Sequence, residues 1–137
     1  MIIILVYTLD FPVLSGQKKN NPYSKFTLSD QLEKVSFTID RDLYLSGEYV
    51  WFSAKCLLAL NNQTSPLSTV VYFELFNAEK KPFIREKFGL TSGMANGSLQ
   101  IPDELPSGIY FLRAYTQFLR NFPVEVFPTR IITVINP

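Results

Sequence analysis

The stretch Tyr49-Val-Trp-Phe-Ser-Ala-Lys-Cys-Leu-Leu-Ala-Leu60 carries the clearest structural pattern in the chain. Its even positions are all apolar: Val50, Phe52, Ala54, Cys56, Leu58 and Leu60. Its odd positions include Ser53 and Lys55. Because successive side chains of a β-strand point to opposite faces, the even set lies on one face. The pattern predicts a strand that buries this face in a core.

The same alternation recurs along the chain between turn residues. We expect further strands at 70–76 and 108–118, with weaker candidates at 35–39, 83–90, 97–101 and 130–135. Gly, Pro, Asn and Ser separate these segments, and Asn96-Gly97 is typical of a tight hairpin turn. No helix of crossover length lies between them, which disfavours a parallel sheet. We therefore predict an all-β fold, an Ig-like or fibronectin-like antiparallel β-sandwich of about seven strands.

The N-terminal part of the chain differs in composition from the rest. Residues 1–16 begin with the apolar run Met1-Ile-Ile-Ile-Leu-Val-Tyr7 and resemble a secretory signal, with an ordinary first strand as the alternative. This run is too short to span a bilayer, so no membrane span is expected. Residues 17–31 are polar and predict a linker. Residues 32–137 then form the predicted sandwich domain.

The composition argues against several functional classes. The chain has 13 basic and 12 acidic residues and a formal net charge of +1, so no field of one sign attracts nucleic acid. It contains no histidine, which removes the commonest general base and metal ligand. The single cysteine, Cys56, lies within the apolar strand and is interpreted as a buried structural thiol. We predict no catalytic residue, no metal and no cofactor.

A charged cluster follows the first predicted strand. The run Asp40-Arg41-Asp42 lies close in sequence to Gly47 and Glu48. An arginine binds carboxylates in bidentate geometry, so these charges are expected to pin a connection across one end of the sandwich. Gly47 would allow a positive φ at the turn. We predict a structural clasp rather than a binding site.

Two further interpretations concern the same group of residues. Tyr110 is predicted to bury its ring and to bond its hydroxyl to the preceding turn, as a tyrosine corner does. A calcium site built from Asp40, Asp42 and Glu48, with Asp103 or Glu104 as a further ligand, is the alternative to the clasp, but calcium takes about six to eight oxygens and the remaining loop ligands are missing. The predicted clasp therefore consists of Asp40, Arg41, Asp42, Gly47, Glu48 and Tyr110.

Two segments of the chain resemble one known family. Thr38-Ile-Asp-Arg-Asp-Leu-Tyr-Leu-Ser-Gly-Glu48 resembles the T-D-R-x-x-Y-x-x-G-E signature of the macroglobulin-type domain in the α-macroglobulin and complement family. Ile39 interrupts the usual Thr-Asp pair. Leu105-Pro-Ser-Gly-Ile-Tyr-Phe-Leu-Arg-Ala-Tyr-Thr116 resembles the L-P-x-G-x-Y-x-L-R-A strand of that family. The resemblance, to the second macroglobulin-like domain, covers about residues 33–137.

The resemblance carries expectations about location and activity. The sequence of these segments is similar to that of large Bacteroidetes cell-envelope proteins that contain a TonB-dependent receptor plug. This similarity implies an exported protein, periplasmic or associated with the outer membrane. In the α-macroglobulin family such domains frame an endopeptidase-inhibiting trap. The trap also needs a bait region and usually a thioester Cys-Gly-x-x-Gln, and neither appears in this sequence. This domain alone is therefore not expected to inhibit a protease.

Aromatic residues make up 15% of the chain, and several occupy positions predicted to face outward. The set is Trp51, Tyr72, Phe76, Phe111 and Tyr115. Exposed aromatics clustered on one sheet usually indicate an interface. The leading hypothesis is a non-catalytic module that packs against an adjacent domain of the parent chain or another envelope protein.

Three other interpretations of the sequence stay open. In the first, long neighbouring side chains or the N-terminal segment cover the aromatic residues. In the second, the same residues form a stacking platform for cell-surface glycans. The third is an enzyme, since a glycosidase can use two carboxylates without histidine. The acidic residues fall mainly in predicted turns, which gives the enzyme the least support.

Overall fold

The computed structural model describes residues 32–137, and residues 33–137 form one compact unit. The predicted signal segment (1–16) and linker (17–31) lie outside the described residues. Eight strands and two short 3-10 helices lie within these described residues. They are β1 (Glu33–Ile39), β2 (Leu43–Leu45), β3 (Tyr49–Leu58), β4 (Val70–Phe76), β5 (Pro82–Gly89), β6 (Met94–Gln100), β7 (Gly108–Tyr115), η2 (Phe118–Asn121), η3 (Val124–Val126) and β8 (Thr129–Ile135).

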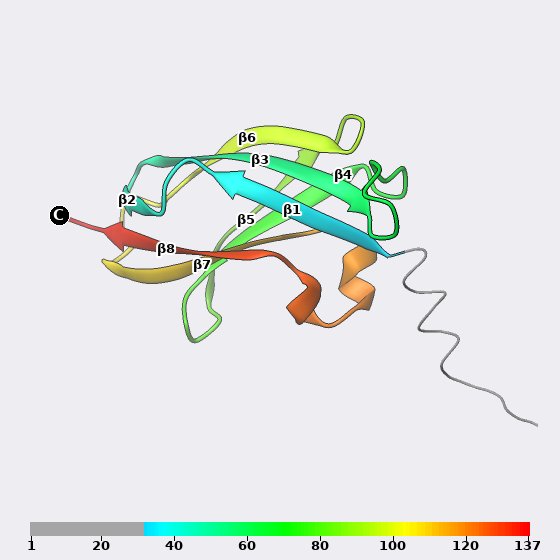
Figure 1. The fold of residues 1–137 in the computed structure, drawn as a ribbon. Helices are drawn as coiled ribbons and strands as arrows, with labels where there is room; N and C mark the ends of the chain where they lie inside the picture. Colours follow the sequence, from blue (N-terminus) through cyan, green and yellow to red (C-terminus); the bar gives the residue numbers. More distant parts are fainter. Residues whose placement is uncertain (1–31) are drawn as a thin grey trace, which may run out of the picture. The chain divides into compact units, whose positions relative to one another are not determined.

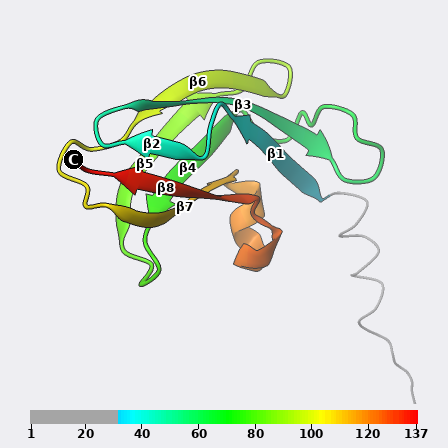
Figure 2. The same ribbon diagram turned by 60° about the vertical axis from the view of Figure 1, so that its left-hand side comes forward.

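The strands form two sheets that pack face to face (Figure 1). The three-stranded sheet has the order β1-β3-β6, and the five-stranded sheet has the order β2-β8-β7-β4-β5. Figure 2 shows the two layers from a second direction, with η2 and η3 at the end of the sandwich where β1 begins. The predicted all-β sandwich is confirmed.

One strand was not expected, and it also changes the predicted pairing. The short β2 pairs in parallel with β8, whereas every other strand pair is antiparallel. The parallel pair between β2 and β8 is an addition to the predicted antiparallel sandwich. Three residues between a charged run and a glycine turn are too few for an alternation to be recognised, because a period of two needs about four residues.

The core lies between the sheets and contains a cluster of aromatic rings. Phe73 of β4 packs against Phe52 of β3 and Phe37 of β1, with ring centroids 4.2 and 5.2 Å apart. Phe88 of β5 completes the cluster at 4.7 Å from Phe52. Burying each such side chain contributes about 1.5–3 kcal/mol. The alternation read from β3 is correct as far as the strand extends, but Leu60 lies beyond its end and is 66% exposed.

The predicted turn at Asn96-Gly97 is wrong, because both residues lie inside β6, opposite Ser53 and Phe52. A Cβ at Gly97 would lie 3.1 Å from the rings of both Phe52 and Phe88, so the core needs a glycine at this strand position. The tight turn is at Ser92-Gly93, where φ is 51° and 74°. Positive φ at both central residues is the type I′ pattern, for which Asn-Gly is only one of the suitable pairs.

The strand predicted at 108–118 ends early, at Tyr115. Thr116 turns the chain instead, and its hydroxyl accepts a hydrogen bond from the Leu119 N–H at 3.2 Å. Leu119 is fully buried at the start of the connection to β8. This connection contains η2 and η3.

Candidate functional site

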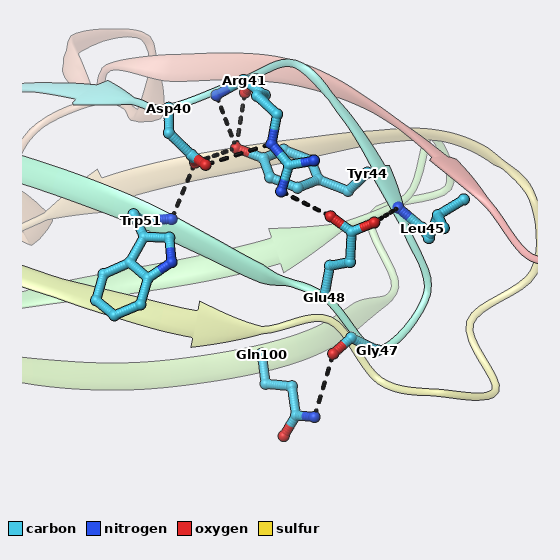
Figure 3. Close-up of polar contacts among 8 residues, drawn as sticks. All are labelled: Asp40, Arg41, Tyr44, Leu45, Gly47, Glu48, Trp51 and Gln100. Carbon is cyan, nitrogen blue, oxygen red and sulfur yellow. Dashed lines mark hydrogen bonds and ion pairs between the residues drawn. The ribbon is translucent and has the colours of Figure 1, made fainter.

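The predicted clasp centres on a tyrosine that sequence reasoning missed. Tyr44 of β2 is 1% exposed, and its hydroxyl donates to Asp40 Oδ1 at 2.7 Å and lies 2.7 Å from the Arg41 carbonyl oxygen (Figure 3). Asp40 Oδ1 also accepts the backbone N–H of Trp51 at 3.0 Å. These contacts join β1, β2 and β3. The signal was present in the sequence, since Tyr44 occupies the tyrosine position of the T-D-R-x-x-Y-x-x-G-E signature.

Arg41 bridges two carboxylates at the solvent-facing side of the clasp. Its Nη2 lies 2.6 Å from Glu48 Oε1, and its Nε lies 3.3 Å from Asp40 Oδ2. Glu48 Oε2 in turn accepts the N–H of Leu45 (Figure 3). The Arg41 side chain is 48% exposed, so water and salt screen both ion pairs. The pairs position the loop more than they stabilise the fold.

The electrostatics of the clasp follow from these hydrogen bonds. Burial acts to raise the pKa of Asp40, but the hydrogen bonds from Tyr44 and from the Trp51 N–H outweigh it and hold the pKa below its usual range. Burial and the Asp40 carboxylate together raise the pKa of Tyr44. Asp40 is therefore an ionised acceptor and Tyr44 a neutral donor at physiological pH.

The other predicted clasp residues have separate roles. Gly47 has the expected positive φ, 88°, and a side chain there would meet Asp103 Oδ1 at 2.5 Å. Asp42 contributes its backbone carbonyl, which accepts the N–H of Thr133 at 2.8 Å, rather than a carboxylate bridge. The hydroxyl of Tyr110 donates to the Pro106 carbonyl at 2.7 Å.

The structure thus divides the predicted set, with Tyr110 on β7 taking no part in the contacts around Arg41. Within residues 32–137, no group of three or more acidic or cysteine side chains could hold a metal ion. In the same range no helix is long and apolar enough to cross a membrane.

The predicted aromatic interface is only partly on one face. Tyr72 and Phe76 of β4 lie beside Tyr115 and Phe111 of β7 on the outer face of the five-stranded sheet, as stacked pairs with centroids 5.5 and 5.6 Å apart. Trp51 is 59% exposed but belongs to β3 of the other sheet. Placing Trp51 in this cluster was wrong, because period two gives the face of a strand and not the sheet to which the strand belongs.

Tyr115 was also wrongly placed among the exposed residues, since it is only 4% exposed. Phe127, from the connection before β8, stacks on its ring at 5.0 Å and covers it. Tyr72 covers the other side. The half-buried Tyr72, Phe76 and Phe111 remain as the aromatic part of this outer face.

A buried carboxylate lies at the centre of this outer face. Glu74 is 4% exposed, and its Oε1 accepts two N–H groups of Arg113 at 2.8 and 3.0 Å. Its Oε2 accepts Arg85 Nε at 2.7 Å and the Tyr115 hydroxyl at 2.8 Å. Burial acts to raise the pKa of Glu74, but these donors outweigh it and lower the pKa. We call Glu74, Arg85, Arg113 and Tyr115 the Glu74 ridge.

Next to the ridge, the outer face is aliphatic. Ile131 and Ile135 of β8, Ile109 of β7 and the two leucines of β2 all lie on the side of the sheet away from the core. They are 41–60% exposed. We call Leu43, Leu45, Ile109, Ile131 and Ile135 the aliphatic strip. Sequence reasoning missed it, although the nearly continuous apolar run Ile131-Ile-Thr-Val-Ile135 is a signal of a strand covered on both faces.

A second buried carboxylate accepts hydrogen bonds from three hydroxyl groups. Glu33, at the start of β1, is 1% exposed and accepts hydrogen bonds from Ser65 at 2.5 Å, Ser68 at 2.8 Å and Thr116 at 2.8 Å. Burial and the nearby Glu33 raise the pKa of Cys56 to about 12. The thiol is therefore protonated and unreactive at neutral pH, in agreement with its interpretation as structural.

The sequence matches no protein-family model and no curated protein. Solved structures do match. A domain of a mutant Salmonella alpha-2-macroglobulin superposes with a TM-score of 0.59 at 17% identity, covering 77% of this chain and 6% of that one. The native conformation of the E. coli alpha-2-macroglobulin gives 0.60 at 16% identity, covering 74% and 6%. The domain has a macroglobulin-like fold.

A third match extends the comparison to a different protein. The Yersinia pseudotuberculosis adhesin InvE superposes with a TM-score of 0.51 at 11% identity, covering 76% of this chain and 32% of that one. At these identities the likeness concerns the fold alone. The chain spans only 6% of the length of the macroglobulins it matches.

Proposed function

We propose that this macroglobulin-like domain is a non-catalytic interaction module whose outer five-stranded face packs against another domain. The observation that carries the proposal is the aliphatic strip. Five large aliphatic side chains from three adjacent strands lie together at the β2 edge of the sheet, each 41–60% exposed. Soluble domains rarely leave such contiguous apolar surface uncovered.

The chemistry of the described residues supports a non-catalytic role. Cys56 is buried and protonated, and the sequence has no histidine to activate a nucleophile. Two arginines form ion pairs with Glu74 and favour its ionised form, and hydroxyl groups surround Glu33. Neither buried carboxylate is free to act as a general acid or base toward a substrate.

The partner we propose is an adjacent domain of the parent protein or another envelope protein, in an exported setting. The macroglobulin-like fold and the similarity of residues 38–48 and 105–116 to that family support this setting. Fractionation of the source cells tests it. Recovery of the protein in the cytosol would contradict export.

Site-specific photocrosslinking tests the docking face. A benzophenone side chain at position 131, in the aliphatic strip, is expected to form an adduct in the source cells, identified by peptide mass mapping. The same group at position 55, an exposed site on β3 of the other sheet, is the matched control. Equal labelling at the two positions, or none at position 131, would contradict the proposal.

The glycan-binding alternative stays a prediction with less support. A sugar platform needs exposed ring faces on one surface, but Tyr115 is covered and Trp51 lies on the other sheet. A binding isotherm against a glycan panel distinguishes the two functions, since saturable binding that Tyr72→Ser abolishes would favour the glycan.

A further inference from the structure

Two small hollows flank the Glu74 ridge on the outer face of the five-stranded sheet. The first has a volume of 180 Å³ and the second 200 Å³. Glu74, Arg85 and Arg113 line both, so the ridge forms the wall between them. Lys80, Pro82 and Phe76 complete the first hollow. Arg120, Tyr115, Phe122, Val124 and Phe127 complete the second.

The hollows carry a local excess of positive charge in a chain that is nearly neutral overall. Lys80, Arg85, Arg113 and Arg120 face one carboxylate, Glu74, so four positive charges and one negative leave a formal +3. The whole chain carries +1. Glu74 is the only acidic residue among the described residues that line either hollow.

Glu74 does not use all of the donors that surround it. Arg85 and Arg113 reach it through Nε and Nη2, and within residues 32–137 their Nη1 groups make no hydrogen bond. The side chain of Arg85 is 64% exposed. Arg120 is exposed, and among the described residues its side chain makes one hydrogen bond, a 3.5 Å contact with Gln117. These unused donors are available to an acceptor group of a binding partner.

The ridge is also rigid, as recognition of a planar anion requires. The Arg113 guanidinium lies over the Phe76 ring at 4.7 Å and near the Phe127 ring at 5.7 Å. Its two bonds to Glu74 fix its plane. A guanidinium held in this way has lost its rotamer freedom before the ligand binds, so binding costs less entropy.

We propose that the Glu74 ridge binds an acidic segment of a protein partner, whose carboxylates enter the hollows on either side of Arg85. Guanidinium groups bind carboxylates in bidentate geometry. Each hollow is smaller than the roughly 300 Å³ at which small-molecule sites begin, which suits single side chains of a larger partner. The apolar rim formed by Phe76, Phe122 and Val124 suits the apolar residues between those carboxylates.

This inference rests on the proposed function, because the ridge and the aliphatic strip share one sheet face. A peptide titration of the full chain tests it, followed by calorimetry and by the NMR signals of the arginine Nε–H groups. The probes are a peptide of alternating Glu and Val, its Gln–Val counterpart, and oligogalacturonate as a carboxylate carried on sugar. We expect saturable binding of the Glu peptide in the millimolar range or tighter, at least about tenfold stronger than the Gln peptide.

Two variants locate the site. Arg120→Gln removes a positive charge that lines the second hollow and takes no part in holding Glu74. The fold should therefore be unchanged, while Glu-peptide binding weakens about threefold or more. Arg85→Gln should weaken Glu-peptide binding further, because Arg85 lines both hollows. Arg113 still neutralises Glu74 in this variant. Lys55→Gln, on the opposite sheet, removes the same charge and should leave binding unchanged.

Several results would overturn the inference. Equal binding of the Glu and Gln peptides, no binding of either, or an unchanged affinity in Arg120→Gln would each exclude the site. Tighter binding of oligogalacturonate would identify an acidic glycan as the ligand instead. A crosslink at position 131 together with a failed titration would leave the proposed docking face intact and remove only the acidic segment.

Discussion

The Asp40–Glu48 clasp and the Glu74 ridge are both arginine–carboxylate clusters, but their composition is inverted. In the clasp one arginine meets two carboxylates, and all three side chains are 31–48% exposed. In the ridge one carboxylate, 5% exposed, meets two arginines. The clasp has no positive charge left over, whereas the ridge has donors to spare. The proposed binding role of the ridge rests on this difference in spare donors.

The largest expected effect comes from removing the ridge carboxylate. Glu74→Gln keeps the shape but leaves the partly buried Arg113 without its counter-charge. We expect a loss of about 2 kcal/mol in the free energy of unfolding, less than for a fully enclosed pair because Arg85 faces water. Urea denaturation measures it. Glu86→Gln on the exposed part of β5 is the matched control, and equal losses in both would show that Glu74 is not special.

The pH dependence of stability should distinguish the two clusters next. The pKa of Glu74 and that of Asp40 are both lowered on folding, from usual values of 4.5 and 3.8. Their contribution is therefore present above those values and is lost as the pH falls through the lower folded pKa. We expect urea midpoints to decline below pH 4.5. Glu74→Gln should flatten this decline more than Asp40→Asn, and the reverse order would place the stronger cluster at the clasp.

The clasp should depend on its tyrosine more than on its arginine. Tyr44→Phe removes the hydroxyl that joins Asp40 to the Arg41 carbonyl, while the ring stays in place. We expect a loss of about 1 kcal/mol in unfolding free energy. Thermal and urea unfolding both measure it. Tyr72→Phe, whose ring is half-buried on the outer face, is the control. A loss as small as the control's would mean that water replaces the Tyr44 hydrogen bonds.

The smallest effect is expected at Arg41. Arg41→Gln breaks both ion pairs of the clasp, but these are exposed and screened. Its unfolding midpoint should lie closer to the wild-type value than that of Tyr44→Phe does, and raising the salt concentration should narrow its remaining difference from the wild type, because salt screens the exposed pairs. A larger drop in the unfolding midpoint than for Tyr44→Phe would show that the ion pairs, rather than the tyrosine hydroxyl, stabilise the clasp.

How far sequence reasoning reached depends on the range of each interaction. Alternation within a strand is local, so the strands around Val50, Phe73 and Leu112 could be predicted, as could the clasp charges that lie within nine residues of one another. The Glu74 ridge could not be, because Arg85 and Arg113 come from different strands, 11 and 39 residues away. The turn at Asn96-Gly97 was wrongly predicted for a related reason, since the rings that require a glycine at position 97 lie on other strands.

The buried Glu33 has a practical consequence for the smallest piece of this chain that can fold. Its carboxylate is the common acceptor for hydroxyls from Ser65, Ser68 and Thr116, which lie 32, 35 and 83 residues further along the chain. A version cut to begin at Lys34 would keep every apolar contact of β1 beyond that point, yet would leave three hydroxyls facing an empty position. Anyone who excises the domain should therefore place the cut before Glu33, because that side chain ties the first strand to two distant loops.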